Sequence, residues 1–287
     1  MIMSHKRLTI AVISPAGIPD PAGLEQGLSL IRSWGHEVIT GPHVGAKWRY
    51  MAGDNDQRSA DLRWAFETTG IDVVWIARGG FGVQHCLKAL PVGMNDDRIV
   101  IGCSDATALL HYLSLQGHTR LVHGPMIDTL ASGVTDETRA RVRHILTGNF
   151  HGEMPVSSSN QAALEGKLIG GNLTMLASMC GTPQQINTRG AILMLEDVTE
   201  HAFRLDRMVL QLRDSGALDG VKAIVLGEYV RCYLPAGADY TADELMENLL
   251  QPLGVRVVRG AGFGHGRDNY AWPYGHNAQL QGGRLVF

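Results

Sequence analysis

The 287-residue sequence lacks several features that would place it in a specialised class of protein. No apolar run approaches the roughly 18 to 20 residues that a membrane-spanning helix needs. The four cysteines are scattered and form no CxxC pair, which is typical of a protein in a reducing cytoplasm. Basic residues are concentrated nowhere, and the formal net charge is −3. We therefore expect no nucleic-acid or membrane partner and favour small-molecule chemistry.

The composition, with 45% hydrophobic and 18% charged residues, predicts one large domain or two ordinary domains, each with its own core. The apolar run at residues 8–13 is too short for the core of a signal peptide, and no cleavage site of small residues follows it. We interpret this run as part of the first strand and predict a cytoplasmic protein.

Strands alternate with helices in the first half of the chain. The patterns predict strands at 7–14, 36–40, 71–77 and 98–102, a helix after Asp20, a helix capped by Asp54, and a helix over 105–115. The strand at 71–77 is apolar almost throughout, as in a sheet that is buried on both faces. The alternation predicts an open, mostly parallel α/β sheet with flanking helices and right-handed crossovers.

A polar stretch without periodicity at residues 151–163 has the composition of a linker. We place an N-terminal domain at 1–150 and a C-terminal domain at 164–287. In the second domain the patterns predict helices from Asn172, over 202–213 and over 242–250, strands at 191–195, 221–226 and 255–258, and two short C-terminal strands.

The glycine-rich loop RGGFG at residues 78–82 follows a predicted buried strand. Open α/β sheets bind ligands in loops at the carboxyl ends of their strands, where glycines let backbone N–H groups approach an anionic oxygen. A simple strand-to-helix turn is the alternative, since the spacing fits neither a dinucleotide fingerprint nor a P-loop.

Ser104 follows the next buried strand, within GCSDAT at residues 102–107. It would lie on a sharp turn at a helix N-terminus, as in a nucleophile elbow, although the flanking residues do not spell G-x-S-x-G. In that geometry the N–H of Asp105 faces a developing oxyanion. The alternative is that Ser104 or Asp105 only caps the helix.

A nucleophilic serine needs a base and an acid that orients the base. Among 12 histidines, His265 stands out because glycines flank it in GFGHGRDN at 262–269, and His123 is its competitor. Glu196 ends an apolar strand, where a carboxylate can orient an imidazole, and a plain surface acid is the alternative. No histidines have HxxxH or HxH spacing, so a metal site has weak support.

Together these segments resemble the LD-carboxypeptidase family of serine peptidases. The matching motifs are ARGGFG at 77–82, GCSDATALL at 102–110, HGPM at 123–126, GKLIGGNLTML at 166–176, GTP at 181–183, LEDVTEHAFRLDRMVLQL at 195–212 and GHGRDN at 264–269. They run in the family's order over nearly the whole chain. The resemblance implies an α/β N-terminal domain, a mixed and more β-rich C-terminal domain, and an active site in the cleft between them.

The resemblance also implies roles for individual residues. Ser104 would be the nucleophile, Glu196 the orienting acid and His265 the general base. The oxyanion hole would combine the N–H of Asp105 with a backbone N–H of Gly79 or Gly80. No metal or organic cofactor is implied, and a homodimer is consistent with the family.

The activity that the resemblance implies is release of D-alanine from murein tetrapeptides during peptidoglycan recycling. An arginine is the natural partner of the peptide's terminal carboxylate. Arg78, Arg204 and Arg207 are the candidates, and ion pairs within the protein are the alternative for all three.

Three alternatives remain open at this point. A relative of the microcin immunity peptidases would cleave an aminoacyl or peptidyl adenylate and would need an aromatic shelf, for which Trp48, Trp75 and Trp272 are present. A non-catalytic muropeptide-binding protein would keep the cleft without turnover. Cys103, which stands where many family members have an aromatic residue, could replace Ser104 as nucleophile, although a packed thiol fits its place at a strand end better.

Overall fold

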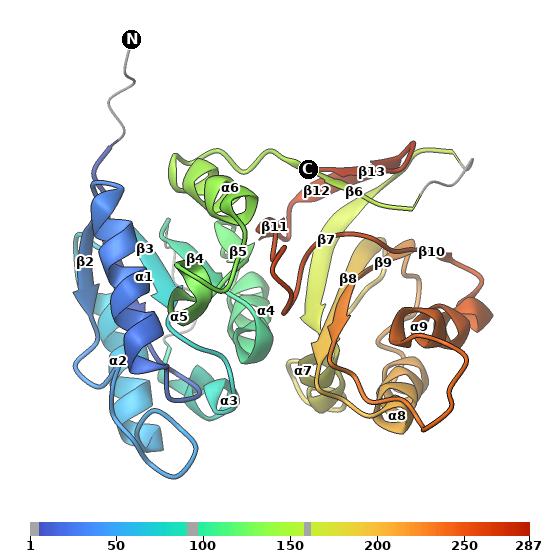
Figure 1. Cartoon of the computed structure of the whole chain (residues 1–287), viewed down its shortest axis with the longest axis horizontal. Helices are drawn as coiled ribbons and strands as arrows, with labels where there is room; N and C mark the ends of the chain where they lie inside the picture. Colours follow the sequence, from blue (N-terminus) through green and yellow to red (C-terminus); the bar gives the residue numbers. More distant parts are fainter. Residues whose placement is uncertain (1–5, 91–96, 158–161) are drawn as a thin grey trace.

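Two β-sheets, each with its own helices, form the two lobes of the protein (Figure 1). The computed structural model describes residues 6–90, 97–157 and 162–287. The first sheet has the order β11-β5-β4-β3-β1-β2, and the second has the order β10-β9-β8-β7-β12-β13-β6.

The first sheet is parallel except at one edge. Its strands are β1 (Thr9–Ile13), β2 (Glu37–Thr40), β3 (Val73–Ile76), β4 (Ile99–Gly102), β5 (Leu121–His123) and β11 (Trp272–Tyr274). Only β11 runs antiparallel, alongside β5. The predicted open, mostly parallel α/β sheet is confirmed.

Helices cover both faces of this sheet because its strands send apolar side chains to each side. The lobe contains α1 (Pro21–Ser33), α2 (Asn55–Glu67), α3 (Val83–Cys86), η1 (Leu87–Ala89), η2 (Ser104–Ala106), α4 (Thr107–Leu115), α5 (Ile127–Leu130) and α6 (Asp136–Leu146). Ile10 and Val12 of β1 share a core with α1, α5 and α6, whereas Ala11 and Ile13 share the other core with α2, α3 and α4. Asp54 caps α2, as predicted, and Asp20 caps α1 by accepting a hydrogen bond from the N–H of Gly23.

The second sheet is mixed. Parallel strands β7 (Leu164–Asn172), β8 (Ala191–Val198), β9 (Ala223–Val230) and β10 (Arg256–Val258) adjoin antiparallel β12 (Asn277–Gln281), β13 (Arg284–Val286) and β6 (Glu153–Pro155). The helices of this lobe are α7 (Leu173–Ser178), α8 (Ala202–Asp214), α9 (Ala242–Leu250) and η3 (Gln251–Leu253). This arrangement confirms the expected mixed α/β lobe.

One hydrophobic core joins the lobes, since residues of β3, β4 and α4 belong to the same buried cluster as those of β7, β8 and β9. The strand β11 also lies in the first sheet, although it comes from the last part of the chain (Figure 1). The segment 151–163, expected as a linker, contributes β6 to the second sheet, and its residues 158–161 lie outside the described part. The division into domains at 151–163 therefore stays a prediction. Two strands do not follow it, because β6 lies inside the expected linker and β11, from the C-terminal range, belongs to the first sheet.

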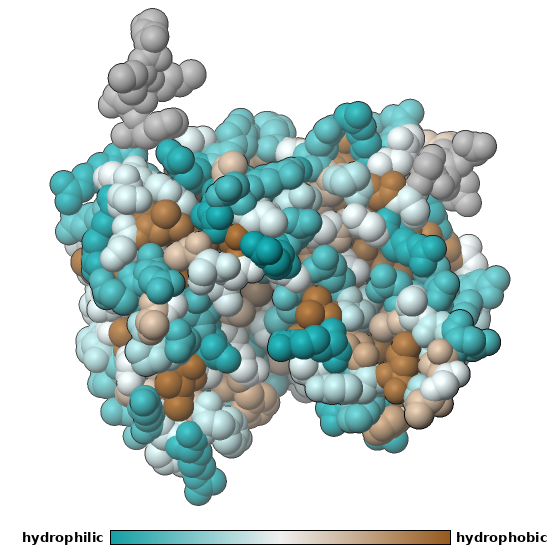
Figure 2. Space-filling view, viewed as in Figure 1, coloured by the Kyte–Doolittle hydropathy of each residue, from teal (hydrophilic) through white to brown (hydrophobic). Residues whose placement is uncertain are grey.

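The face of the molecule in Figure 2 is largely hydrophilic, with hydrophobic side chains in small separate patches. Large exposed hydrophobic side chains include Tyr50, Phe81, Phe203 and Tyr233. Among the helices of the described ranges, none is both long and apolar enough to cross a membrane.

Candidate active site

Ser104 lies on a strained turn between β4 and the helical segment that leads into α4. Its backbone φ is 59°, which places a non-glycine residue in the left-handed region. Cys103 and Asp105 on either side are buried, whereas Ser104 is partly exposed. This sharp strand-to-helix turn presents the hydroxyl at the carboxyl end of the sheet, as a nucleophile elbow does.

The loop at residues 78–82 packs directly against this serine. A Cβ atom on Gly79 would lie 2.8 Å from both Cβ and Oγ of Ser104, so only glycine allows this approach. The carbonyl of Gly79 accepts a hydrogen bond from the N–H of Gly17 at 2.7 Å, and Gly80 has a φ of 107°. The structure thus brings two of the predicted oxyanion residues, Gly79 and Asp105, to either side of Ser104.

Asp105 also acts through its side chain, which sequence reasoning did not predict. Its Oδ2 accepts a hydrogen bond from the N–H of Val83 at 2.8 Å, at the start of α3. Burial raises the pKa of Asp105 to about 6, against the opposing effects of this bond and of the Arg58 charge. Arg58 is buried and donates to the carbonyls of Pro15 and Gly82, both at 2.8 Å. Asp105 and Arg58 therefore fix the loop that contacts Ser104.

Glu196 and His265 form a buried pair. Glu196 lies near the end of β8, at a register irregularity between Leu195 and Asp197, and its side chain is 0% exposed. Nδ1 of His265 lies 2.6 Å from Oε2 of Glu196. A Cβ on Gly264 would lie 2.9 Å from that same oxygen, so the glycine before His265 permits the contact. The structure brings these two residues into contact.

The two groups shift each other's pKa in opposite directions. Burial by itself would raise the pKa of Glu196, but the charge and hydrogen bond of His265 outweigh it and hold that pKa below the ordinary value. Burial would likewise lower the pKa of His265, but the Glu196 carboxylate raises it above the ordinary value. The pair is thus an ionised acid that increases the basicity of an imidazole.

Asn269 links the surroundings of the serine and the histidine. Its Nδ2 lies 3.6 Å from Sγ of Cys103, and its Oδ1 accepts a hydrogen bond from the N–H of Gly264 at 3.3 Å. Cys103 precedes Ser104 and Gly264 precedes His265, so this buried side chain joins the two loops. Burial also raises the pKa of the Cys103 thiol strongly, as expected of a packed thiol and not of a nucleophile.

A second layer of polar side chains supports the end of β8. Asp197 accepts hydrogen bonds from Nδ2 of Asn172 at 3.1 Å and from both the N–H and the hydroxyl of Thr174 at 2.9 Å. Asp197 lies inside the motif LEDVTE, and Asn172 and Thr174 lie inside GGNLTML. Polar residues within these motifs are the only feature of the sequence that indicates this network.

The candidate arginines each have a partner within the protein. Arg78 pairs with the buried Asp128 at 2.9 Å, Arg204 pairs with Glu200 at 2.5 Å, and the Arg207 guanidinium lies 5.6 Å from the Phe203 ring centre. The alternative of internal pairing, which the sequence left open, thus describes Arg78 and Arg204.

Two of the three tryptophans considered for an aromatic shelf are unavailable. Trp75 and Trp272 are fully buried, and Nε1 of Trp75 donates to the carbonyl of Pro125 at 2.8 Å. Trp48 is 41% exposed, with the Arg49 guanidinium 4.6 Å from its ring centre.

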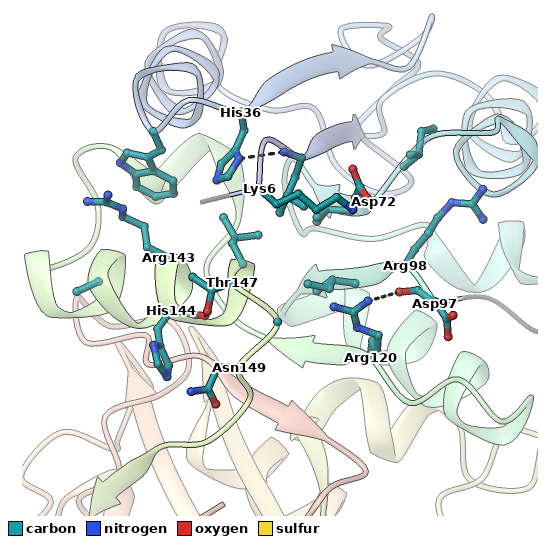
Figure 3. A pocket seen from close by; sticks show the side chains of 18 residues that line it. Lys6, His36, Asp72, Asp97, Arg98, Arg120, Arg143, His144, Thr147 and Asn149 are labelled. Carbon is teal, nitrogen blue, oxygen red and sulfur yellow. Dashed lines mark hydrogen bonds and ion pairs between the residues drawn. The ribbon is translucent and has the colours of Figure 1, made fainter. Parts of the chain in front are cut away.

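A pocket of about 1190 Å³ lies at the opposite end of the first sheet, where β1, β3, β4 and β5 begin (Figure 3). Its rim includes Lys6, Arg98 and Arg120, but Lys6 pairs with Asp72 at 2.9 Å and Arg120 donates to the carbonyl of Asp97 at 2.8 Å. None of the predicted site residues lines it. The candidate site is therefore at Ser104 and not at this pocket, because the carboxyl ends of the strands combine a strained hydroxyl with the Glu196–His265 pair.

Among the described residues, no group of three or more His, Cys, Asp or Glu side chains is arranged to hold a metal ion. A strained serine packed against a glycine loop, together with a buried Glu–His pair, is an arrangement typical of a serine hydrolase.

Comparison with known proteins agrees with this class. The model of the LD-carboxypeptidase N-terminal domain matches residues 10–124, and that of the C-terminal domain matches residues 165–280. The murein tetrapeptide carboxypeptidase of Pseudomonas aeruginosa is 35% identical over 291 residues, which cover 96% of this chain and 94% of that protein. The chain therefore belongs to the LD-carboxypeptidase family, and it is a serine-type carboxypeptidase, a hydrolase.

Solved structures share the fold. The crystal structure of muramoyltetrapeptide carboxypeptidase from Oxalobacter formigenes has a TM-score of 0.85 and 30% identity, covering 96% of this chain and 97% of that one. The microcin C7 self immunity protein in complex with aspartyl sulfamoyl adenosine has a TM-score of 0.85 at 20% identity, covering 98% of this chain and 95% of that one.

Proposed function

We propose that this enzyme removes D-alanine from murein tetrapeptides, using Ser104 as nucleophile, His265 as general base and Glu196 as orienting acid. The observation that carries the proposal is the 2.6 Å contact between Nδ1 of His265 and the buried Glu196. This contact commits Nδ1 to the acid and leaves Nε2 for the serine proton. The names of the relatives supply the substrate class.

In this mechanism, Oγ of Ser104 attacks the carbonyl of the L-configured residue while His265 takes the hydroxyl proton. Backbone N–H groups of Asp105 and of the Gly79–Gly80 turn hold the tetrahedral oxyanion. His265 then passes its proton to the departing amine of D-alanine, and an acyl-enzyme remains. Water, deprotonated by His265, hydrolyses the ester and restores the serine.

The proposal extends to the enzyme's setting. The free tetrapeptide arises during peptidoglycan recycling, so we place the enzyme in the cytoplasm, acting without a cofactor and without a nucleic-acid or membrane partner. A homodimer is part of the proposal by family resemblance. One of Arg78, Arg204 and Arg207 would bind the terminal carboxylate in exchange for its partner within the protein, and Arg78 directly precedes Gly79.

The deciding experiment measures free D-alanine from the tetrapeptide L-Ala-D-Glu-meso-diaminopimelate-D-Ala, with wild type, Ser104→Ala and a chelator control. We expect release by wild type that survives the chelator and falls by roughly 10²-fold or more in the variant. Equal release by wild type and Ser104→Ala would remove Ser104 from the mechanism. Absence of release from wild type would overturn the substrate assignment.

The fold shared with the microcin immunity protein makes aminoacyl adenylates the second candidate substrate. Hydrolysis of aspartyl sulfamoyl adenosine by wild type, at a rate far above that on the tetrapeptide, would favour this reading. Binding of the tetrapeptide by wild type and Ser104→Ala alike, with no turnover of either substrate, would indicate the third reading, a muropeptide-binding protein.

A further inference from the structure

The two oxygens of Glu196 have different surroundings. Oε2 contacts Nδ1 of His265 at 2.6 Å, whereas Oε1 has no hydrogen-bond partner among the described residues. Oε1 lies 4.0 Å from Nε2 of His123, and both side chains are 0% exposed. Because a buried carboxylate oxygen without a donor is costly, the group that faces it matters for the charge of Glu196.

The fold holds the His123 ring rigidly in this place. His123 ends β5, in register with Trp272 of β11, and the two rings stack with centres 5.0 Å apart at 13°. Phe263 makes a T-shaped contact with the His123 ring, with ring centres 5.8 Å apart and ring planes at 88°. On another side, Gly171 has a φ of 123°, and a Cβ there would lie 3.3 Å from Cδ2 of His123. Packing, and not a hydrogen bond, therefore fixes the direction of Nε2.

His123 faces Glu196 as a neutral ring. Burial lowers the pKa of His123 to about 4, although the Glu196 charge opposes this. A neutral imidazole carries one N–H, and neither ring nitrogen of His123 has a hydrogen-bond partner among the described residues. The negative charge of Glu196 favours the tautomer with the proton on Nε2, so an N–H dipole points at Oε1. At 4.0 Å this is an electrostatic contact, which a small side-chain shift converts into a hydrogen bond.

We propose that His123 is a positioning residue, whose neutral Nε2–H holds Oε1 of Glu196 and keeps that carboxylate ionised and directed at His265. Glu196 then lies between two imidazoles with different tasks. His265 gains and loses a proton during turnover, whereas His123 stays neutral throughout. The inference deepens the proposed function, since it rests on Glu196 and His265 acting as a pair.

Other titratable or charged groups also act on this pair. The groups whose titration or charge is coupled to Glu196, His265 or both are Cys103, Asp197, Glu228, Tyr229, Arg231 and Cys232. Asn172 adds a polar side chain that lowers the pKa of Glu196. Because substitutions at His123 leave all these groups in place, a change in titration reports on His123 itself.

The test compares His123→Met with His123→Gln, which are similar in length but differ in having an N–H donor. Without the Nε2–H of His123, the negative charge of Glu196 is less stabilised. The Glu196–His265 pair should then bind a proton more strongly. In His123→Met we expect the acid limb of the pH profile of kcat/KM to move to higher pH, and kcat to fall about tenfold or more with KM nearly unchanged. In His123→Gln we expect both quantities to return toward wild type.

A second readout needs no substrate. The proton between Nδ1 of His265 and Oε2 of Glu196 should give a far-downfield resonance in ¹H NMR, assigned by its loss in His265→Gln. We expect its titration midpoint to rise in His123→Met and to stay near wild type in His123→Gln. If no tetrapeptide is cleaved by wild type, the proposed function fails while this titration still decides the role of His123.

The matched control is His111→Met, at another buried histidine whose pKa burial also lowers to about 4, and whose Nδ1 lies 2.9 Å from the hydroxyl of Tyr274. It should cost stability without moving the midpoint. Identical titration of both His123 variants and wild type, or an equal shift in His111→Met, would overturn the proposal. Should His123→Met fail to fold, His123→Phe, which retains a ring on Trp272, takes its place in the same comparison.

Discussion

The carboxylate of Asp105 accepts a hydrogen bond from the N–H of Val83 at 2.8 Å, so the residue after Ser104 is tied to the end of the glycine loop. The same loop is held from its other side by Arg58, which donates to the carbonyl of Gly82. The two proposed sources of oxyanion N–H groups, Asp105 and the Gly79–Gly80 turn, are therefore parts of one hydrogen-bonded unit.

Asp105→Ala should weaken both stability and turnover. It leaves the buried N–H of Val83 without its acceptor, which typically costs about 1–3 kcal/mol. We expect kcat to fall roughly 10- to 100-fold, because small displacements of catalytic groups are costly. Urea unfolding and steady-state kinetics measure the two effects, and Asp136→Ala, at a side chain that is 99% exposed, is the control. Unchanged turnover in a destabilised Asp105→Ala would show that the hydrogen bond between Asp105 and Val83 contributes only to folding.

The backbone conformation of Ser104 should lower the stability of the protein, because a φ of 59° strains any residue that has a Cβ. Ser104→Gly and Ser104→Ala should both be inactive, but Ser104→Gly should be more stable than Ser104→Ala by about 1 kcal/mol, since only glycine relieves the strain. Thermal unfolding of the two variants measures the difference. If the alanine variant were the more stable one, the left-handed turn at Ser104 would be wrong.

The pH dependence of activity should follow His265. Glu196 raises the pKa of this imidazole above the ordinary value of 6.5. We therefore expect kcat/KM to decrease as the pH is lowered, with a midpoint above pH 6.5. In Glu196→Gln the residual activity should be at least roughly 10²-fold lower, with its midpoint moved to lower pH. Glu137→Gln, in the exposed first turn of α6, is the control. A Glu196→Gln enzyme with wild-type rate and midpoint would remove Glu196 from the triad.

The same shift makes a stability prediction. Because the folded pKa of His265 is raised, its stabilising effect is complete below the unfolded pKa near 6.5 and is lost as pH rises through the folded value. The unfolding free energy of wild type should therefore decline over that window more than that of His265→Gln, as urea titrations at several pH values would show.

Much of the fold and the core of the site could be predicted from the sequence, because the informative signals were local. The buried strand before Ser104, the glycines beside His265 and the acid at the end of β8 are each visible within a few residues. The patterns predict no strand over 164–172, although this run forms β7, because Gly170 and Gly171 have low strand propensity. The helix α6 was missed because its exposed polar residues obscure a buried face of only a few positions.

The remaining features depend on contacts between distant residues, which no local pattern encodes. The side-chain bond of Asp105 to Val83 spans 22 positions, and the contact of Asn269 with Cys103 spans 166. The stacking of His123 on Trp272 arises only because β11 returns to the first sheet. The sequence left His123 open as the competing base, and its complete burial beside Trp272 is what separates it from His265.

The strand β11 also restricts the motion of the two lobes around the candidate site. The chain leaves the second sheet at Val258, passes through the loop with His265, and is hydrogen-bonded into the first sheet from Trp272. His265, the proposed base, is therefore tethered on both sides, once to each lobe. A wide swing of one lobe against the other would have to break the pairing of β5 with β11. We expect the catalytic residues to be preorganised before substrate arrives, with no domain-closure step contributing to the turnover rate.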